Sequence, residues 1–430
     1  MKLDLSGLLR DRFVRGTFFV TAANFGGALF NFLVHPILTR RLSIQAYGDF
    51  QALLSFVTIL GVLATVINTT LIKEFSALVA ARAGEFGALR RRAVKRFSLL
   101  GLAIFVLIVF FAGPLNILFH ISKSAILVIA SVSFLYSFPL SVNRAALSAK
   151  QDFFALALSN FLDPFFRILF VILFVVVWQL GLIGAAWAIA LNGLVGWLYA
   201  FRQVKKLALP PPAVDFEPRL RRFWRYSLMV LWFTVLAQFS YNFDMLFVKS
   251  VFSPEEAGLY GALLTVGRII YFVGGAVPIV MFPVVAKLGQ DCRRRHAVLV
   301  KSLALMAALS LPVYFVMFRW PELVLRIVVG AKYLSMAPYL PAFGLVMLAL
   351  SLVSVLSSYF LALARRRSLL ILTGAVILEI ILLGAFHGSL MQVITSLGAS
   401  FAAAAVALLC LAFVEYRADR RLSESKVMSF

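Results

Sequence analysis

The stretch LTRRLSIQAYGDFQALL at residues 38–54 returns in altered form as VKSVFSPEEAGLYGALL at residues 248–264. At a single offset of 210 residues, the two stretches share a serine, a glycine and an Ala-Leu-Leu triplet. The same offset matches Arg15 with Arg225, each of which stands just before a long apolar segment. One register that fits both a loop and a flanking arginine indicates an internal repeat. The alternative is that an apolar hairpin recurs by composition alone.

The composition restricts the class of protein. Of the 430 residues, 62% are hydrophobic and 14% are charged, and the mean hydropathy is +0.97. That leaves too little polar surface to cover a soluble globule, so we expect a polytopic membrane protein. The net charge of +23 lies in short basic runs between apolar segments. Such runs are typical of topology signals, and we expect membrane lipids rather than nucleic acid as their partners.

Twelve apolar segments are long enough to cross a hydrocarbon core of about 30 Å as helices. Runs such as ILFVILFVVVW are apolar on every side and lack the alternation of a β-barrel strand. The sequence therefore predicts an all-α polytopic fold with about 12 transmembrane helices, at residues 17–39, 46–72, 97–119, 124–149, 153–177, 180–201, 226–250, 256–286, 298–318, 335–363, 369–388 and 392–415.

A basic, Pro-rich segment at residues 202–225 divides these helices into six and six. We expect an N-terminal bundle at 1–201, which begins with an interfacial segment, and a C-terminal bundle at 226–416 followed by a cytoplasmic tail at 417–430. Because six is even, the bundles are expected to be parallel repeats around a central cavity. Loops on the N-terminal side hold 31 Lys and Arg against 7 on the other side, which predicts that both termini are cytoplasmic.

Two parallel bundles that rock against each other expose a cavity first to one side of the membrane and then to the other, as secondary transporters do. The chain has no GxxxxGKS/T nucleotide motif, and its 18 Asp and Glu are scattered rather than clustered. We therefore expect neither an ATP-driven pump nor an enzyme, and no cofactor. Cys292 and Cys410 have no metal-type spacing, so no metal site is expected.

Three stretches carry a resemblance to a known family: FVTAANFGGALFNFLVHPILTRRLSIQAYGDFQALLSF at 19–56, SVNRAALSAKQDFFALALSNFLDPFFRILF at 141–170 and SPEEAGLYGALLTVGRII at 253–270. With them the chain resembles the polysaccharide (O-antigen type) flippase family of the multidrug/oligosaccharidyl-lipid/polysaccharide exporter superfamily. The resemblance implies that a polyprenyl-pyrophosphate-linked oligosaccharide is moved to the outer leaflet of the cytoplasmic (inner) membrane, for cell-surface polysaccharide synthesis. It also implies a polysaccharide polymerase and glycosyltransferases as partners.

Such cargo needs buried cations and amides in a wet cavity. Arg268 is the first candidate, because it lies about 18 Å deep in an expected helix with no acid within helical reach. Arg167 is similarly deep, but Asp163 lies four residues earlier on the same face, so an ion pair between them is an equal alternative. Arg144 either snorkels to the interface or, with Asn143, lines the cavity.

Coupling to Na⁺ or H⁺ would need a carboxylate within the membrane. Asp244 is a candidate, and an interfacial ion pair with Lys249 is the alternative. Glu379 stands in the middle of an expected helix, where it is either a proton relay or a protonated packing group. The remaining candidates are Asp163 and His35 for coupling, and Asn31 and Asn242 for cargo.

Three other functions stay open. An ion-coupled multidrug efflux antiporter of the same superfamily would carry cationic drugs, so its cavity would favour acids over arginines. A lipid II flippase would be expected to have additional helices, for which this chain has no residues. A non-transporting membrane scaffold in a polysaccharide assembly complex would be expected to have uncharged cavity positions. The intramembrane arginines rank the oligosaccharide flippase first.

Overall fold

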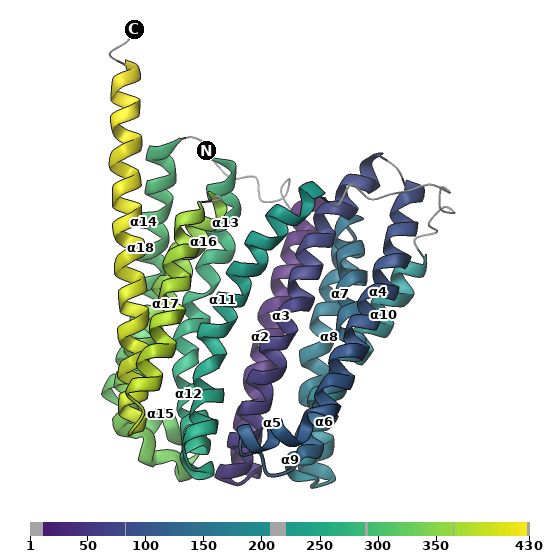
Figure 1. Cartoon of the computed structure of the whole chain (residues 1–430), viewed down its shortest axis with the longest axis vertical. Coiled ribbons are helices and arrows are strands. Elements are labelled where there is room, and N and C mark those ends of the chain that lie inside the picture. The colour runs from purple at the N-terminus through teal and green to yellow at the C-terminus, as the bar shows by residue number, and fades with distance from the viewer. Residues whose placement is uncertain (1–11, 82, 207–220, 289–290, 364, 428–430) are drawn as a thin grey trace. The chain divides into compact units, whose positions relative to one another are not determined.

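The described part of the chain consists of helices joined by short loops. The computed structural model of the protein describes residues 12–81, 83–206, 221–288, 291–363 and 365–427. In these residues there are helices and no strand, which confirms the all-α prediction. They fall into two compact units, Met1–Thr234 and Val235–Phe430, called unit 1 and unit 2 below (Figure 1). Most of the expected N-terminal interfacial segment and most of the expected linker at 202–225 lie outside the described residues.

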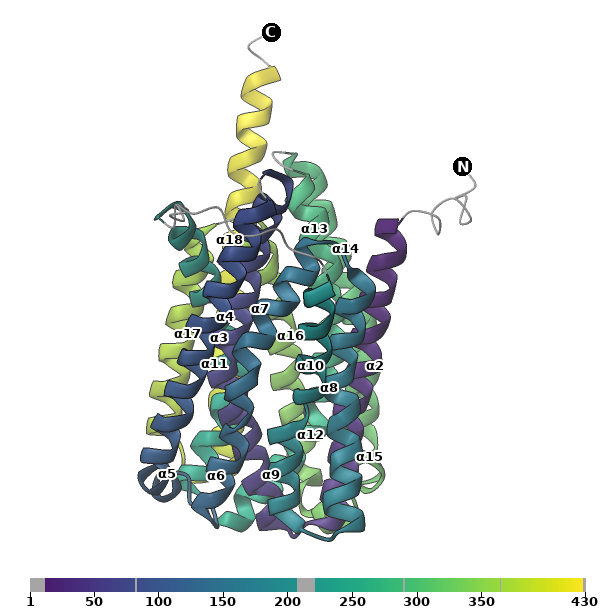
Figure 2. The ribbon, with the colours of Figure 1, turned by 90° about the vertical axis from the view of Figure 1, so that its right-hand side faces the viewer.

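Unit 1 is built from long helices, some of which are interrupted. α2 packs along α8, and α3 and α4 pack on α7. The core between α3, α4 and α7 contains the buried rings of Phe75, Phe86, Phe134 and Phe138. Figure 2 brings α4, α7 and α8 toward the viewer. The elements are α2 (Arg12–Arg41), α3 (Ile44–Ala81), α4 (Ala83–Phe110), α5 (Ala112–Leu118), α6 (Ser124–Ser131), α7 (Ser133–Ala149), α8 (Phe153–Val171), a π-helical turn (Ile172–Val177), α9 (Gly181–Leu191) and α10 (Leu194–Lys206).

Unit 2 is organised around α16, which packs on α12, α13, α14 and α18. The rings of Tyr260 on α12 and Phe343 on α16 are fully buried and meet edge to face, with centroids 5.9 Å apart. α18 continues through residues 417–427, so most of the expected tail is helical. The boundary between the units falls within α11 (Arg221–Val251), whose residues from Val235 onward belong to unit 2. The other elements are α12 (Pro254–Gly274), α13 (Ala276–Lys287), α14 (Cys292–Arg319), α15 (Pro321–Val328), a 3₁₀ segment (Ala331–Tyr339), α16 (Leu340–Ala362), α17 (Arg366–Ala385) and α18 (Leu390–Val427).

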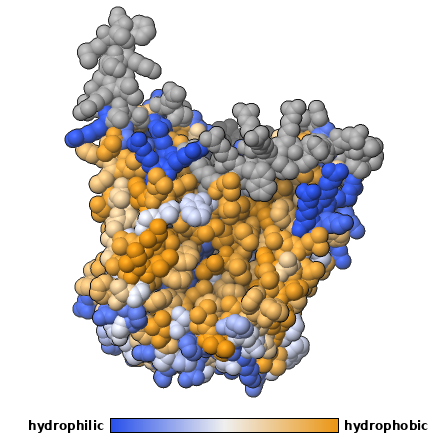
Figure 3. All heavy atoms as spheres, in the orientation of Figure 1, coloured by the Kyte–Doolittle hydropathy of each residue, from blue (hydrophilic) through white to orange (hydrophobic). Residues whose placement is uncertain are grey.

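Each of the twelve predicted spans coincides with one helix or with one interrupted helix. Ten helical segments among the described residues are long and apolar enough to cross a membrane. The first helix of each repeat, α2 or α11, is not among these ten, and both carry polar side chains in their interiors, such as Asn31 and Asp244. Figure 3 shows apolar side chains along the middle of the helices and polar side chains gathered at helix ends, as a membrane protein requires.

The two repeat stretches adopt the same helix–loop–helix structure in the same register. The loop between α2 and α3 occupies residues 42–43, and the loop between α11 and α12 occupies residues 252–253, so the offset of 210 residues is kept. Matched side chains are buried alike, with Phe50 and Tyr260 only 1% and 0% exposed. The structure therefore confirms the repeat that the sequence predicts.

The second of these loops is the better capped. Ser253 Oγ accepts the N–H of Glu256 at 3.3 Å, and the Glu256 carboxylate accepts the N–H of Ser253 at 3.1 Å. This reciprocal pair satisfies two backbone donors at the start of α12. In the first loop, Ser43 Oγ accepts the N–H of Ala46 at 3.2 Å, but an alanine has no carboxylate to return the bond. Both serines thus cap a helix, and only one belongs to a capping box.

We expect Ser253→Ala to lower the free energy of unfolding by about 1 kcal/mol, because an N-cap acceptor and its reciprocal bond are lost. Ser43→Ala should lower it by less. Thermal unfolding of both variants in the same detergent measures the difference. Ser253→Asn keeps an acceptor at the cap and should unfold like the wild type. Equal losses at the two serines would contradict a contribution from the carboxylate.

Candidate functional site

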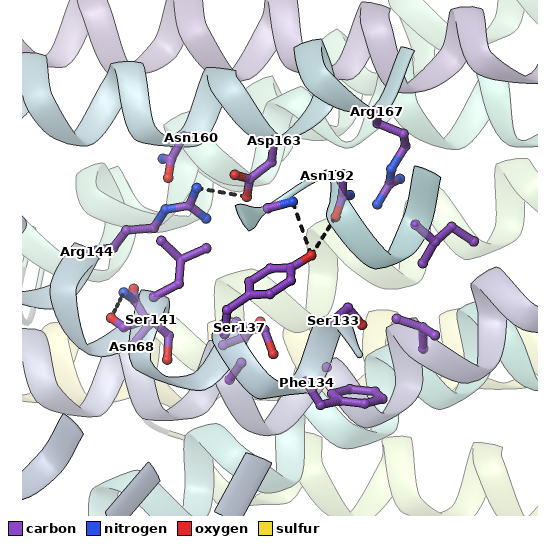
Figure 4. Close-up of a pocket in the computed structure, with 18 of the residues that line it drawn as sticks. Asn68, Ser133, Phe134, Ser137, Ser141, Arg144, Asn160, Asp163, Arg167 and Asn192 are labelled. Atoms are coloured by element: carbon purple, nitrogen blue, oxygen red, sulfur yellow. Dashed lines mark hydrogen bonds and ion pairs between the residues drawn. The ribbon is translucent and has the colours of Figure 1, made fainter. Parts of the chain in front are cut away.

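Unit 1 contains a cavity of about 420 Å³ bounded by α3, α7, α8 and the break between α9 and α10 (Figure 4). Among the described residues that line it, three are charged, namely Arg144, Asp163 and Arg167. Two guanidinium groups therefore face one carboxylate, and the lining has an excess of one positive charge. Amides and hydroxyls supply the rest of its polar surface, including Asn68, Ser137, Asn160 and Asn192.

Tyr136 fills the break between α9 and α10. Its hydroxyl donates to the carbonyl of Ala190 at 2.9 Å and accepts the N–H of Gly193 at 3.2 Å. These backbone groups lose their helical partners at the break, and inside a membrane such groups must be satisfied by the protein. A Cβ on Gly193 would lie 2.7 Å from the Tyr136 ring, so only glycine fits against it. The tyrosine thus makes an interrupted helix possible beside the cavity.

Sequence reasoning singled out Arg144 but missed the polar face of α7 on which it lies. Ser133, Tyr136, Ser137 and Ser141 line the same cavity and precede Arg144 at steps of one helical turn. In a segment that is otherwise apolar, a polar stripe with this spacing is the signal that would have found them.

Arg144 turns into the cavity and makes an ion pair there. Its Nη2 lies 2.8 Å from Asp163 Oδ2, its Nε donates to Ser159 Oγ at 3.0 Å, and Nη2 also donates to the Ser159 carbonyl. Figure 4 shows the pair, with Arg144 coming from α7 and Asp163 from α8. The intrahelical pair between Asp163 and Arg167 does not form, because the aspartate is taken by the arginine on the neighbouring helix. Only helix packing could decide between the two arginines.

Arg167 is therefore the less satisfied cation. Its Nη1 donates to Asn31 Oδ1 at 3.1 Å, which links α8 to α2. Its Nε is buried and has no hydrogen-bond partner among the described residues. A buried guanidinium donor without an acceptor is costly, and a bound anion would satisfy it.

Unit 2 holds a second polar cluster, at the junction of α11 and α12. Asp244 is 3% exposed, lies 3.6 Å from Arg268 Nη2 and accepts the Tyr260 hydroxyl at 2.9 Å. The Arg268 guanidinium also stands 4.1 Å from the centroid of the Tyr241 ring and donates to the Tyr241 carbonyl. The ion-pair partner of Asp244 is thus Arg268, while Lys249 is itself fully buried. The acid that pairs with Arg268 is Asp244 on the preceding helix, so the spacing of residues along one helix could not predict this pair.

In the first repeat, the positions that match this cluster hold other side chains. At the offset of 210 residues, the positions that match Asp244, Tyr260 and Arg268 are Val34, Phe50 and Thr58. Val34 and Phe50 are each 1% exposed, so the packing position is the same and the chemistry differs. The charged cluster is therefore particular to the second repeat.

Glu379 on α17 is fully buried, and neither of its carboxylate oxygens has a partner in hydrogen-bonding geometry among the described residues. Its charged neighbour is Asp244, and Ser240 lies beside it. Two acids are thus close together in unit 2, and Arg268 is the cation that pairs with one of them. The second acid lacks such a partner in the described part of the unit.

The remaining candidates bond within the protein. Asn143 is fully buried and accepts two bonds from Arg90, at 3.0 and 3.2 Å, so it points away from the cavity that its neighbour Arg144 lines. Asn242 bonds to the residue one turn earlier in α11, and His35 Nδ1 lies 3.0 Å from the Tyr47 hydroxyl. Among the described residues, no group of three or more His, Cys, Asp or Glu is placed to hold a metal ion.

Known proteins match the chain in sequence and in fold. A family model described as "Polysaccharide biosynthesis protein" matches residues 37–338. No curated protein shows a significant match. Several solved structures share the fold. One is an inward-facing multidrug resistance MATE family transporter of the MOP superfamily, with a TM-score of 0.76 and 14% identity over 92% of this chain and 96% of that one. Another is the lipid II flippase MurJ in an inward closed conformation, with a TM-score of 0.73 and 16% identity over 91% of this chain and 87% of that one. A third is a MOP superfamily transporter from Pyrococcus furiosus, whose binding pocket is described as of reverse polarity, with a TM-score of 0.62 and 15% identity over 95% of this chain and 96% of that one.

Arg268→Ala would leave Asp244 buried without its cation, and we expect it to lower the free energy of unfolding by about 3 to 5 kcal/mol. Thermal unfolding in detergent measures this loss. Replacing both members, as in Arg268→Met with Asp244→Asn, removes the uncompensated charge and should restore most of the stability. A single variant as stable as the wild type would show that the pair does not stabilise unit 2.

Proposed function

The chain belongs to the polysaccharide biosynthesis protein family, and we propose that it is a flippase that moves a polyprenyl-pyrophosphate-linked oligosaccharide across the cytoplasmic membrane by alternating access. The observation that carries this proposal is the excess positive charge of the unit 1 cavity. The diphosphate is the anionic part of such cargo, and guanidinium groups bind phosphate oxygens in paired hydrogen bonds. Arg144 and Arg167 are the residues that would hold it.

The size of the cavity indicates which part of the cargo it would hold. A volume of about 420 Å³ is in the lower part of the range of roughly 300–1,000 Å³ typical of small-molecule sites. It suits a diphosphate with its first sugar, and the rest of the glycan and the isoprenoid chain would extend beyond it. The amides of Asn160 and Asn192 and the hydroxyl of Ser137 are suitable partners for sugar hydroxyls.

A multidrug antiporter is the second candidate, because MATE transporters share the fold. A cationic drug would need an excess of negative charge in its pocket. Among the described residues that line the unit 1 cavity, the one acid is Asp163, and Arg144 neutralises it at 2.8 Å. The charge of the cavity therefore favours an anionic cargo. A lipid II flippase carries an anionic cargo too, and we rank a polysaccharide precursor ahead of lipid II because the chain belongs to a polysaccharide biosynthesis family.

We also propose that unit 2 couples transport to an ion gradient through Glu379 and Asp244. An ionised carboxylate is costly in a dry interior unless a cation or proton accompanies it. Glu379 has no such cation among the described residues, so a proton or Na⁺ would supply the charge.

The excess of Lys and Arg in one set of loops favours cytoplasmic termini in the inner membrane. A polymerase and glycosyltransferases would be the partners before and after transport.

The cargo is tested in proteoliposomes that contain a fluorescent polyprenyl-diphosphate oligosaccharide. We expect movement between leaflets, and a loss of about tenfold or more in Arg167→Gln, because a charged hydrogen bond contributes about 1.5 to 3 kcal/mol. Arg326→Gln makes the same change at the end of α15 and should transport normally. Ethidium efflux measured in parallel tests the antiporter. Efflux of ethidium without movement of the glycolipid would contradict the proposal, and movement of neither would favour a scaffold.

Coupling is tested in the same vesicles with an imposed pH or Na⁺ gradient. We expect the wild type to respond to one of the two gradients and Glu379→Gln to lose that response, because an amide neither binds a proton nor neutralises a cation. Glu379→Asp keeps the acid and should keep the response. A gradient effect that survives in Glu379→Gln would exclude this residue from coupling.

A further inference from the structure

Asp163 pairs with Arg144, which is one of the two cations that the proposed cargo needs. We propose that Asp163 is an internal competitor for the cargo, which holds Arg144 while the cavity is empty and yields it when a diphosphate binds. Cargo binding and the breaking of an ion pair between α7 and α8 would then be one event. This inference rests on the proposed function and concerns how the same cavity releases its cargo.

The carboxylate of the pair accepts hydrogen bonds through only one of its two oxygens among the described residues. Asp163 uses Oδ2 to bind Arg144, while Oδ1 is buried and has no hydrogen-bond partner among the described residues. A carboxylate held by both oxygens would be harder to displace, because two parallel bonds replace one. A partly buried pair with an unmet acceptor recovers less of its desolvation cost. Asp163 is therefore a weak competitor, which is what a reversible exchange requires.

Arg144 does not depend on Asp163 for its position. Its Nε and Nη2 both donate to Ser159, and Ser159 Oγ in turn donates to the carbonyl of Gly196 at 3.2 Å. The guanidinium would stay in place after the carboxylate leaves. No described residue accepts a hydrogen bond from Nη1, so an incoming phosphate oxygen can bind there before the exchange is complete.

A second cation, Arg167, lies within reach of the displaced Asp163 carboxylate. Arg167 lies four residues later on α8, a spacing at which aspartate and arginine can pair, and its buried Nε lacks a described acceptor. The charged and titratable groups that face Asp163 are Arg144 and Tyr136 from α7 and Arg167 from α8. Asp163 can therefore move between two arginines without being left as an isolated buried charge, which would be costly.

A glycine on the neighbouring helix makes room for the pair. A Cβ on Gly196 of α10 would lie against Asp163 Oδ1, 3.0 Å from the carbonyl of Ser159 and 3.2 Å from Arg144 Nη2. Replacing this glycine with alanine would push the carboxylate away from the arginine without changing any charge. The variant therefore separates the effect of the pair from the effect of the net charge.

The inference predicts the affinity for a short prenyl diphosphate. Geranyl diphosphate is titrated into the full-length protein in detergent and followed by calorimetry. Asp163→Asn should lower the dissociation constant about tenfold, since a bond to a charged group no longer has to be broken. In the Arg144→Gln background the same change should bring a clearly smaller gain, because competition for Arg144 is gone and only Arg167 remains within reach of Asp163. An equal gain in both backgrounds would mean a long-range charge effect and would overturn the proposal, as would an unchanged or weaker affinity in Asp163→Asn.

Gly196→Ala should shift the affinity in the same direction as Asp163→Asn. Gly374→Ala is its control, because a Cβ at that position of α17 meets nothing within 4 Å, and it should leave the affinity unchanged. In proteoliposomes, Asp163→Asn should lower both KM and kcat, since tighter binding slows release. A structural role alone would lower kcat and leave KM unchanged or raised, and would overturn the proposal.

The two proposals fail in different ways. A wild-type protein that neither moves the glycolipid nor binds geranyl diphosphate would overturn both. A wild-type protein that does both, with Asp163→Asn unchanged in affinity, would overturn only the competitor.

Discussion

A charge inside the membrane must be met by another polar group, and this constraint decides which charged side chains of the chain meet. Insertion of an isolated charge costs at least about 2.5 to 3.5 kcal/mol. Arg144 and Asp163 meet in unit 1, and Arg268 and Asp244 meet in unit 2. Among the described residues, Arg167 Nε in unit 1 still lacks an acceptor after this pairing, and both carboxylate oxygens of Glu379 in unit 2 lack a donor. In the function that we propose, an external anion would bind at the first of these residues and a proton or Na⁺ at the second.

The repeat explains how one fold holds two kinds of site. Both halves begin with the same helix–loop–helix frame, and matched positions in it are equally buried. The second half places a carboxylate, a phenol and a guanidinium where the first half has valine, phenylalanine and threonine. Because packing depends on burial and shape while recognition depends on charge, duplicated frames can diverge in chemistry without changing fold. The anion site that we propose for the first half lies instead between α7 and α8.

Interrupted helices give the unit 1 cavity its polar walls. The break between α9 and α10 exposes backbone groups that an unbroken helix would satisfy internally, and Tyr136 satisfies two of them. Irregular backbone within a membrane is tolerated where it is buried in protein or lines a cavity. The same tyrosine therefore serves the fold and shapes the site. A cargo with hydroxyl groups would find donors and acceptors here that a continuous apolar helix lacks.

The sequence by itself determined the features that depend on neighbours in the chain. Hydropathy located the twelve helices, and the match between residues 38–54 and 248–264 located the repeat, because both are properties of local composition and register. Tertiary structure alone decided the partners of the charges. Helical spacing allowed Asp163 to pair with Arg167, and packing gave it to Arg144 on another helix. The rotation of one helix against another sets which charges meet, and a single sequence does not encode that rotation in any local pattern.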